Sequence, residues 1–489
     1  MAEKQEKIID QILALTDVAA IIKELTKDDE YLKDAETNQK QYDGDHKILL
    51  RPDKKVGKDD KVKDVPVARL VATFQKVITS LAVAFLVGKP VKYVLDSEEN
   101  TEEAFKQIEG VFDANKIQYF DRKLTRTTMI ETRTAELWYA KNETFDEESP
   151  VPDTDPEYIG SQIGVMLLSN KLGYHIYPHF DQYGNMDAFT VTYDMEQFDT
   201  EKNAIATVSR VDVYTAENFV FYFKEGDAFK LLETKPNQYG KIPVIYYEQE
   251  QAEWKDVQSL IERYEDLISN HADENDYYAA PMIKIMGKLI EPPDKTQTGK
   301  MLQFAGVPSP DQKKLEYGDA SYLTWDHEPV SLKLELDNLK DLIFSNTHTP
   351  DISFNSVKGL TSISGILLKM LFFDARLKSF NHQEVFGEGF TRRLNLVKKM
   401  LQFTSVASEE SLQAVVATPQ FQDPTPQDIA ETITTLSEAL AGEPIMSEDT
   451  ALKNNPYVTD IAEEKLEMEK DKQSKETTEG FEAGSFDAE

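Results

Sequence analysis

The sequence predicts an α+β protein divided into several domains, and three observations lead to this fold class. Several long stretches carry apolar residues at spacings of three and four, which is typical of amphipathic helices. Between Val165 and Tyr247, apolar and aromatic residues alternate with polar ones and turn pairs separate the runs, which is typical of antiparallel strands. A chain of 489 residues is also long enough to bury more than one core.

The composition is that of an acidic, globular chain without thiol chemistry. The 88 acidic residues outnumber the 54 basic ones and give a net charge of -34, and there is no cysteine. Disulfides, thiolate metal sites and thiol nucleophiles are therefore excluded. Such a charge opposes tight wrapping of nucleic acid, because that affinity comes from lysine and arginine at the phosphates. If DNA is a partner, it should therefore slide along this protein rather than be bound tightly.

The sequence predicts neither a secretion signal nor a membrane span. Residues 1–10 are charged and lack an apolar core. The most apolar stretch, Ile78–Val87, has about half of the roughly 20 residues that a span requires. We therefore expect a soluble protein that is made in the cytoplasm and has no membrane partner.

The first 140 residues are expected to be mainly helical. The helical patterns lie in Glu6–Leu25, Asp64–Tyr93, Glu98–Asn115 and Ile117–Ala140. Gly88 and Pro90 stop the second of these helices, and Val91–Leu95 then predicts a strand. The Gly88-Lys89 pair lacks the other residues of a phosphate loop, so we expect a helix cap. His46 has no partner nucleophile, and we expect a structural role for it.

The strand-rich part of the chain contains two histidines at a spacing that would suit a metal on a helix. These are His175 and His179, in the run His175-Ile176-Tyr177-Pro178-His179. Pro178 and the strand-like surroundings favour an extended segment instead. We therefore expect no metal site there.

Two long helices are predicted after the strands. The first begins at Glu253, and if it runs to about Tyr277 it is roughly 40 Å long, with an acidic face opposite the apolar one. Its expected partner is the helical pattern at Leu332–Ile343. Between them, Ala280–Asp326 combines a strand-like run with proline-containing loops.

A loop and a further long helix follow this pair. Pro350 ends a helix, and the apolar spacing from Ile366 onward predicts the next one. Gly387 and Gly389 predict a kink in it.

A locally basic patch lies within this helix, at Thr391–Met400. Its cations are Arg392, Arg393, Lys398 and Lys399. They could contact DNA phosphates, or they could form a solvated helix face that meets the acidic remainder of the chain, and both interpretations stay open. Farther on, Ser447 fits a helix start, and residues 471–489 have the polar, acidic composition of a disordered tail.

The order of these parts resembles that of the portal proteins, or head-to-tail connectors, of tailed bacteriophages. The resemblance covers roughly residues 40–470. The motifs that carry it are Tyr42-x-Gly44-x-His46-x-Ile48-Leu49-x-Arg51, Gly88-Lys89-Pro90, Gly240-x-Ile242-Pro243-Val244-Ile245, Thr349-Pro350-Asp351 with Ser364-Gly365-Ile366-Leu367-Leu368-Lys369, and Ile445-Met446-Ser447-Glu448-Asp449-Thr450. Two features depart from the family: Glu131–Ala135 replaces a Gly-rich step, and an insert containing Gly359 lengthens the loop after Pro350.

The resemblance implies the portal fold, with an α/β wing, a two-helix stem, a small α/β clip, a long kinked helix and an α-helical crown. The implied bounds are residues 1–250 for the wing, 251–278 and 329–348 for the stem helices, 279–328 for the clip, 349–365 for a tunnel loop, 366–405 for the long kinked wing helix, 406–470 for the crown and 471–489 for a disordered acidic tail.

The resemblance also implies a function, that of a portal ring of about twelve copies at one capsid vertex of the virion. The ring would be assembled in the host cytoplasm, would nucleate head assembly and would be the channel for DNA packaging and ejection. The implied partners are other copies of the chain, double-stranded DNA bound without sequence specificity, the terminase large subunit, the major capsid and scaffolding proteins, and neck or adaptor proteins.

The same resemblance assigns residues to these tasks. The tunnel-loop residues expected at the DNA channel are Phe354, Asn355, Ser356, Val357 and Lys358. The stem residues expected to join neighbouring copies are Trp254, Val257, Ile261, Tyr264, Leu339 and Leu342.

The sequence contains no enzyme motif that survives inspection. There is no phosphate loop, no Gly-x-Ser-x-Gly and no His-Glu-x-x-His. Carboxylate pairs such as Asp28-Asp29 lie in hydrophilic runs, with no apolar pocket to raise a pKa. We therefore expect no enzymatic activity, no metal and no cofactor. Two alternatives remain: an acidic oligomeric scaffold or adaptor without a DNA channel, and an acidic two-metal nuclease.

Overall fold

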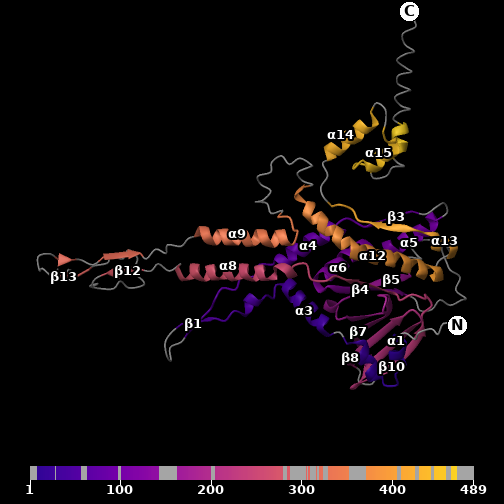
Figure 1. Cartoon of the computed structure of the whole chain (residues 1–489), viewed down its shortest axis with the longest axis horizontal. Helices are drawn as coiled ribbons and strands as arrows, with labels where there is room; N and C mark the ends of the chain where they lie inside the picture. Colours follow the sequence, from indigo (N-terminus) through magenta and orange to yellow (C-terminus); the bar gives the residue numbers. More distant parts are fainter. Residues whose placement is uncertain are drawn as a thin grey trace, which may run out of the picture. The chain divides into compact units, whose positions relative to one another are not determined.

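The computed structural model of the chain divides into two compact units (Figure 1). One comprises Met1–Thr349 and Leu377–Gln422, and the other Pro350–Arg376 and Asp423–Glu489. The residues that the structure describes are 8–27, 29–56, 63–96, 101–141, 162–199, 204–278, 283–286, 304–305, 307–308, 315–316, 319–322, 329–351, 370–404, 409–424, 429–441, 445–458 and 464–470.

A three-stranded antiparallel sheet lies at the centre of the first unit. Its middle strand is β4 (Arg133–Ala140), between β11 (Val244–Glu248) and β5 (Ile163–Leu168). Its core is shared with helices α4 (Phe74–Val87), α5 (Glu102–Ala114), α6 (Ile117–Glu131) and α12 (Phe373–Thr404). The sheet therefore joins segments from both halves of the chain.

A second pairing also links distant parts of the sequence. β3 (Lys92–Leu95) pairs antiparallel with β16 (Ala417–Gln420), which follows α13 (Glu409–Ala414). The strand expected after Gly88-Lys89-Pro90 is therefore present, and its partner comes from the C-terminal part of the first unit.

A five-stranded antiparallel meander forms the second sheet of this unit. Its strands are β6 (His175–Phe180), β7 (Met186–Asp199), β8 (Ala204–Thr215), β9 (Asn218–Glu225) and β10 (Ala228–Pro236), and their order in the sheet is that of the chain. The antiparallel strands expected between Val165 and Tyr247 are therefore confirmed.

Helices from the N-terminal region cover this meander. α1 (Ile8–Leu13) and α2 (Val18–Leu25) bury Ile9, Ile22 and Leu25 against residues of β8 and β9. α3 (Asp29–Asp43) contributes Tyr31 and Ala35 to a separate core that includes residues of β6, β7 and β4. The apolar stripe predicted for Glu6–Leu25 is thus divided between two short helices.

Two long helices lie side by side in Figure 1. They are α8 (Gln258–Tyr278) and α9 (Pro329–Asn346). The described strands between them pair as two short ladders: β12 (Ile283–Met286) with β15 (Asp319–Tyr322), and β13 (Val307–Pro308) with β14 (Leu315–Glu316). The chain leaves along α8 and returns along α9, as the sequence predicted.

The second unit contains the helices α14 (Ile429–Leu440) and α15 (Glu448–Asn454), and residues 464–470 are also helical. The Ser447 hydroxyl caps α15 by accepting a hydrogen bond from the Thr450 amide. The helix start predicted at Ser447 is therefore confirmed.

The structure corrects two predictions of helix extent. The pattern Asp64–Tyr93 is helical only from Phe74 to Val87, and residues 66–73 form neither helix nor strand. The pattern Ile117–Ala140 is helical only to Glu131, and the rest is β4. Thr132 between these two elements has φ of 70°, a left-handed conformation that ends the helix.

The long helix α12 continues through both glycines that predicted a kink. A Cβ at residue 389 would lie 2.1 Å from the ring of Tyr247. Gly389 is therefore explained by the close approach of that ring. Among the described helices, none combines the length and apolar character needed to cross a bilayer.

Candidate functional site

The described part of the chain has a buried structural site where the α8–α9 pair begins. An apolar cluster there contains Trp254, Val257 and Ile261, none of which exposes any of its surface. They pack with Ile78 of α4 and Ile343 of α9. The cluster fixes the start of α8 inside the first unit.

This burial corrects part of the expected stem surface. Trp254, Val257 and Ile261 are enclosed by their own chain, so they present no surface to a neighbouring copy. Leu339 is also largely buried, and Tyr264 is half-buried against Phe74 at a ring-centroid distance of 5.2 Å. Of the six residues, Leu342 is the exposed one, at 48%.

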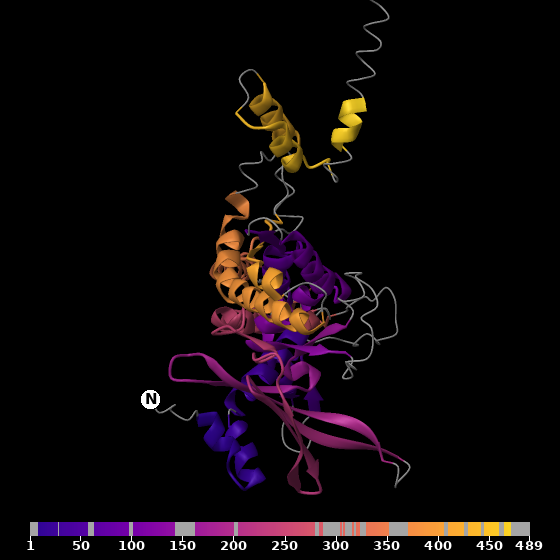
Figure 2. The same ribbon diagram turned by 90° about the vertical axis from the view of Figure 1, so that its right-hand side faces the viewer.

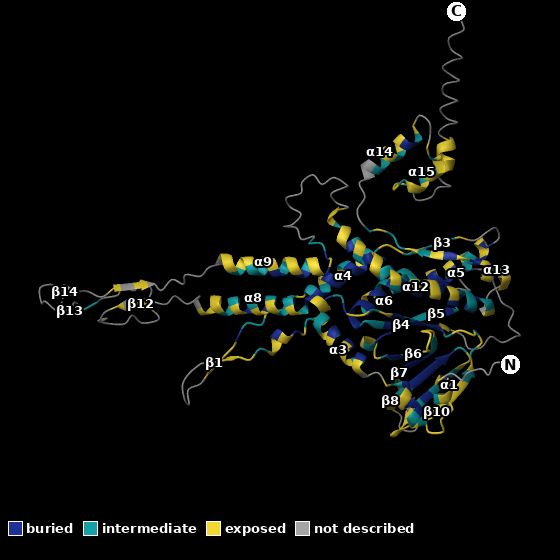
Figure 3. Cartoon of the chain, in the orientation of Figure 1, coloured by how far each residue is buried: buried dark blue, intermediate teal, exposed yellow. Residues whose placement is uncertain are grey.

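The outward side of α9 carries other apolar side chains that the sequence analysis left out. Figure 3 shows exposed stretches along α9 in yellow. Val330 is 77% exposed and Leu334 is 60% exposed, and they are one helical turn apart. The apolar spacing of α9 includes these two residues, but the leucines that face α8 and the leucines that face outward have similar spacing in the sequence. Only the packing of α8 on α9 separates them.

A segment without helix or strand is attached along α8 by regularly spaced hydrogen bonds. The amides of Ala72 and Leu70 donate to Glu265 Oε1 and Ser269 Oγ, each at 2.9 Å. The amide of Ala68 donates to Asp273 Oδ1 at 2.6 Å. Four residues of a helix and two residues of an extended chain both advance about 6 to 7 Å along their axes. Every second amide of the segment can therefore reach every fourth side chain of α8. We call this contact the α8 strap, residues 67–72.

His46 contacts Glu265, the same α8 residue that binds the Ala72 amide of the α8 strap. Its Nδ1 lies 2.5 Å from Glu265 Oε1 and its Nε2 lies 2.7 Å from the Gln41 carbonyl oxygen, and the imidazole is fully buried. When the ring is protonated, both of its nitrogens can donate, one to the Glu265 carboxylate and the other to the Gln41 carbonyl oxygen. Burial lowers the pKa of His46, but the hydrogen bonds to Glu265 and Gln41 outweigh it and raise the pKa above its usual value.

Arg51, from the same N-terminal motif as His46, binds farther along α8. Its Nη2 donates to Asn270 Oδ1 at 2.7 Å and lies 3.0 Å from Asp273 Oδ2. The structural role expected for His46 therefore extends to Arg51: both hold the N-terminal segment on α8.

A buried ion cluster joins the approach to α8 with the ends of two other helices. Glu253, with a 4% exposed side chain, lies 2.6 Å from Lys378 Nζ and 3.2 Å from His382 Nε2. Lys378 also donates to the Thr347 carbonyl oxygen, at the end of α9. Burial raises the pKa of Glu253, but the His382 hydrogen bond and the Lys378 charge outweigh it and lower the pKa to about 2.

The basic patch predicted on α12 is divided by the fold. Arg393 is fully buried, where it binds Glu136 at 2.8 to 3.0 Å and Asp121 at 2.7 Å. Its contact with DNA phosphates is therefore excluded. The guanidinium also lies over the Phe390 ring, at 4.3 Å from its centroid.

The other three cations of the patch are engaged more weakly. Arg392 pairs with Glu388 one turn away, Lys398 donates to the Val415 carbonyl oxygen, and Lys399 donates to Gln402. No comparison bears on their contact with DNA, which stays a prediction. The predicted channel residues Phe354, Asn355, Ser356, Val357 and Lys358 lie outside the described residues.

The two histidines of the strand-rich part lie on β6. His179 Nε2 is 3.0 Å from the Thr190 hydroxyl, and burial lowers the pKa of His179 to about 4. Across the described ranges, no group of three or more His, Asp or Glu residues is arranged to hold a metal ion.

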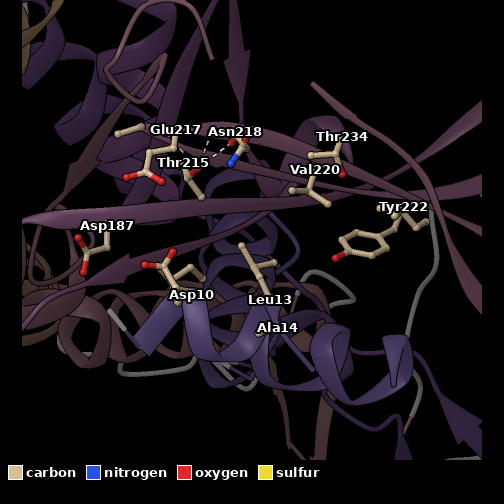
Figure 4. Close-up of a pocket in the computed structure, with 13 residues that line it drawn as sticks. Asp10, Leu13, Ala14, Asp187, Thr215, Glu217, Asn218, Val220, Tyr222 and Thr234 are labelled. Carbon is tan, nitrogen blue, oxygen red and sulfur yellow. Dashed lines mark hydrogen bonds between the residues drawn. The ribbon is translucent and has the colours of Figure 1, made fainter. Parts of the chain in front are cut away.

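A cavity of 360 Å³ lies between α1 and the β8–β9 turn (Figure 4). Asp10, Asp187 and Glu217 line it, together with Thr215. The Thr215 hydroxyl accepts from the Asn218 amide and donates to the Asn218 carbonyl oxygen, so it is committed to the turn. The cavity therefore offers carboxylates without an activated nucleophile beside them.

Comparisons with known proteins address the chain as a whole. A sequence model of the family described as "Phage portal protein, SPP1 Gp6-like" matches residues 23–478. One similar solved structure is titled "Neck of empty GTA particle computed with C6 symmetry"; it has 8% sequence identity and a TM-score of 0.42, over 77% of this chain and 88% of that chain. A likeness of this degree supports no conclusion. A search of curated proteins found no match.

Proposed function

The chain belongs to the SPP1 Gp6-like family of phage portal proteins, and from this premise we propose that it forms the portal ring at one capsid vertex. The family match over residues 23–478 carries this proposal. In it, copies of the chain surround a channel through which double-stranded DNA is packaged and later ejected without sequence specificity. The ring nucleates head assembly, docks the terminase, and afterwards holds the neck proteins.

Within this proposal the parts of the chain have separate tasks. Residues 1–250 with the helix 366–405 form the wing, α8 and α9 form the stem, and residues 279–328 form the clip. Residues 349–365 form the tunnel loop and 406–470 the crown. The net charge of -34 per copy supports a channel that repels phosphate and lets the duplex slide.

The uncovered apolar side chains of α9 support the ring arrangement. Val330, Leu334 and Leu342 are 77%, 60% and 48% exposed in a single chain. Covering such residues with a neighbour's stem would contribute about 25 cal/mol for each Å² of apolar surface removed from water. A head-to-tail contact of this kind closes a ring when it is repeated by rotation.

Size-exclusion chromatography with mass measurement, followed by negative-stain imaging, tests the proposal. We expect a hollow cyclic particle of about twelve copies. A monomer or dimer would contradict the ring and favour the acidic scaffold or adaptor. Incubating the purified protein with duplex DNA and Mg²⁺ tests the nuclease alternative, and cleavage would favour it.

A pair of variants tests the stem contact itself. Leu334→Asp places a charge in the proposed interface, and we expect it to shift the particles toward smaller species. Leu334→Met keeps the position apolar and should leave the ring intact. Equal ring yields for the two variants, at equal thermal stability, would exclude Leu334 from the interface.

A further inference from the structure

The β7–β8 hairpin extends beyond the rest of its sheet, as Figure 2 shows in magenta at the lower right. β6 pairs with β7 only between Met186 and Thr192, and β9 pairs with β8 only between Arg210 and Tyr214. Residues 194–199 and 204–209 continue to pair with each other. We call this two-stranded part the ribbon. Within the described structure, no other strand lies beside it.

One face of the ribbon combines an apolar pair with two carboxylates. Phe198 and Ile205 are opposite each other and are 57% and 68% exposed. The next positions on this face carry Glu196 and Asp194, both exposed. A two-stranded ribbon is marginally stable in water, and its free edges are sites for pairing or burial. The ribbon therefore presents an apolar pair and two carboxylates that another surface can cover.

The outward face of α6 has the complementary chemistry. Lys116, Tyr119, Lys123 and Arg126 follow one another along one side of the helix region, and all four are exposed, Tyr119 at 54%. The acidic residues of α6, Asp121 and Glu131, are both buried. In the described part of the chain, no acidic side chain forms an ion pair with Lys116, Lys123 or Arg126. We call this the α6 face.

We propose that, in the ring, the ribbon of one copy lies on the α6 face of the next copy. Asp194 and Glu196 then pair with Lys123 and Arg126, and Phe198 with Ile205 packs on Tyr119. The ribbon is about 20 Å long and the α6 face about 15 Å, so the two surfaces match in length. The inference rests on the proposed ring and adds a contact between wings.

A second copy fits the α6 face better than DNA does. A duplex approaching this face meets the field of a chain whose net charge is -34. The exposed Tyr119 and the apolar pair of the ribbon also gain from contact with each other, and phosphates offer neither of them an apolar surface. Because the ribbon and the α6 face are different surfaces, their contact is head-to-tail and compatible with a ring.

Cross-linking tests the contact cleanly, because the chain has no cysteine of its own. Glu196→Cys combined with Lys123→Cys should, on oxidation, give a ladder of covalently joined copies on a denaturing gel. Each single variant should give no species above a dimer. The control pair Glu225→Cys with Lys123→Cys places one thiol on β9, away from the ribbon, and should give no ladder.

Charge reversal provides an independent readout. Lys123→Glu with Arg126→Glu should weaken assembly about tenfold, because two attractive pairs become repulsive. Adding Asp194→Lys and Glu196→Lys to the same chain should restore assembly. Matching melting curves would show that each variant is folded.

The outcomes separate this inference from the proposed function. If the unmodified chain forms rings but shows neither the ladder nor the restored assembly, the wing contact is wrong and the ring stands. If the unmodified chain forms no ring, the proposed function fails. If the Lys123→Glu, Arg126→Glu variant assembles normally and only loses binding to duplex DNA, the α6 face is a DNA surface and the inference is overturned.

Discussion

At the scale of single residues, the neighbours Arg392 and Arg393 differ in what their guanidinium groups contact. Arg392 is exposed and pairs with Glu388 on its own helix. Arg393 is buried with Glu136 and Asp121, and Tyr247 donates to the same Glu136 carboxylate at 3.0 Å. Burial raises the pKa of Asp121 to about 6 even with Arg393 beside it. The cation therefore joins α12 to α6 and β4.

We expect Arg393→Met to destabilise the protein by about 3 to 5 kcal/mol, because two carboxylates lose their buried counter-charge. Urea unfolding followed by fluorescence of the buried Trp138 measures this change. Arg392→Met should change the free energy of unfolding by no more than about 0.5 kcal/mol. Equal effects of the two substitutions would contradict the assignment of Arg393 to the core.

The His46–Glu265 pair makes stability depend on pH in a defined direction. The pKa of His46 is raised in the folded state, so the protonated ring stabilises the fold. This contribution is present below the usual histidine pKa of about 6.5 and is lost as the pH rises through the higher folded value. We expect the urea midpoint to fall between pH 6 and pH 9, and to fall less in His46→Gln. An identical pH dependence in that variant would assign the effect to other groups.

At the scale of elements, the α8 strap shows where the sequence was informative and where it was not. The apolar spacing of residues 67–85 predicts one helix, but residues 66–73 form neither helix nor strand. Their backbone amides bind Glu265, Ser269 and Asp273, which lie about 200 residues away in the chain. Local periodicity contains no information on such partners. The existence of α8 and α9 was predictable because each is long and periodic.

We expect Ser269→Ala to loosen the α8 strap without unfolding α8. The Leu70 amide loses its acceptor, which costs about 1 kcal/mol and corresponds to roughly fivefold faster amide exchange. Hydrogen exchange of residues 66–73 measures this effect. Asp266→Ala, on the exposed side of the same helix, should leave their exchange rates unchanged. If both variants exchange alike, Ser269 does not hold the segment.

The boundary between α6 and β4 illustrates a second limit of the sequence. Leu137 and Trp138 fit a continuation of the helical stripe, yet they lie on a strand between β11 and β5. Thr128 and Thr134 share a buried hydrogen bond across the turn at Thr132. The change from helix to strand after Thr132 is favoured by the neighbouring strands β11 and β5 on the two sides of β4. These strands are present only in the folded sheet.

At the scale of the whole molecule, the predicted site residues fall into two groups. Some make their contacts within one chain, and others were expected to make contacts between copies of the chain. The motif around His46 and Arg51 identified the family, and its contacts to α8 are intramolecular. The stem residues chosen by apolarity included Trp254 and Ile261, which a single chain already buries. Apolar residues of an interior and of an interface obey the same periodicity. Sequence alone therefore could not tell them apart.

If the chain forms the proposed ring, its net charge of -34 makes assembly depend on ionic strength. Copies in solution repel one another, and the repulsion reaches about 30 Å at 0.01 M salt but only about 10 Å at 0.1 M. The apolar contacts proposed for Val330 and Leu334 are not weakened by this screening. We therefore expect the ring fraction, measured by mass photometry at fixed protein concentration, to rise between 0.02 M and 0.3 M NaCl. A fall over the same range would mean that attractive charge pairs between copies, and not apolar stem contacts, dominate assembly.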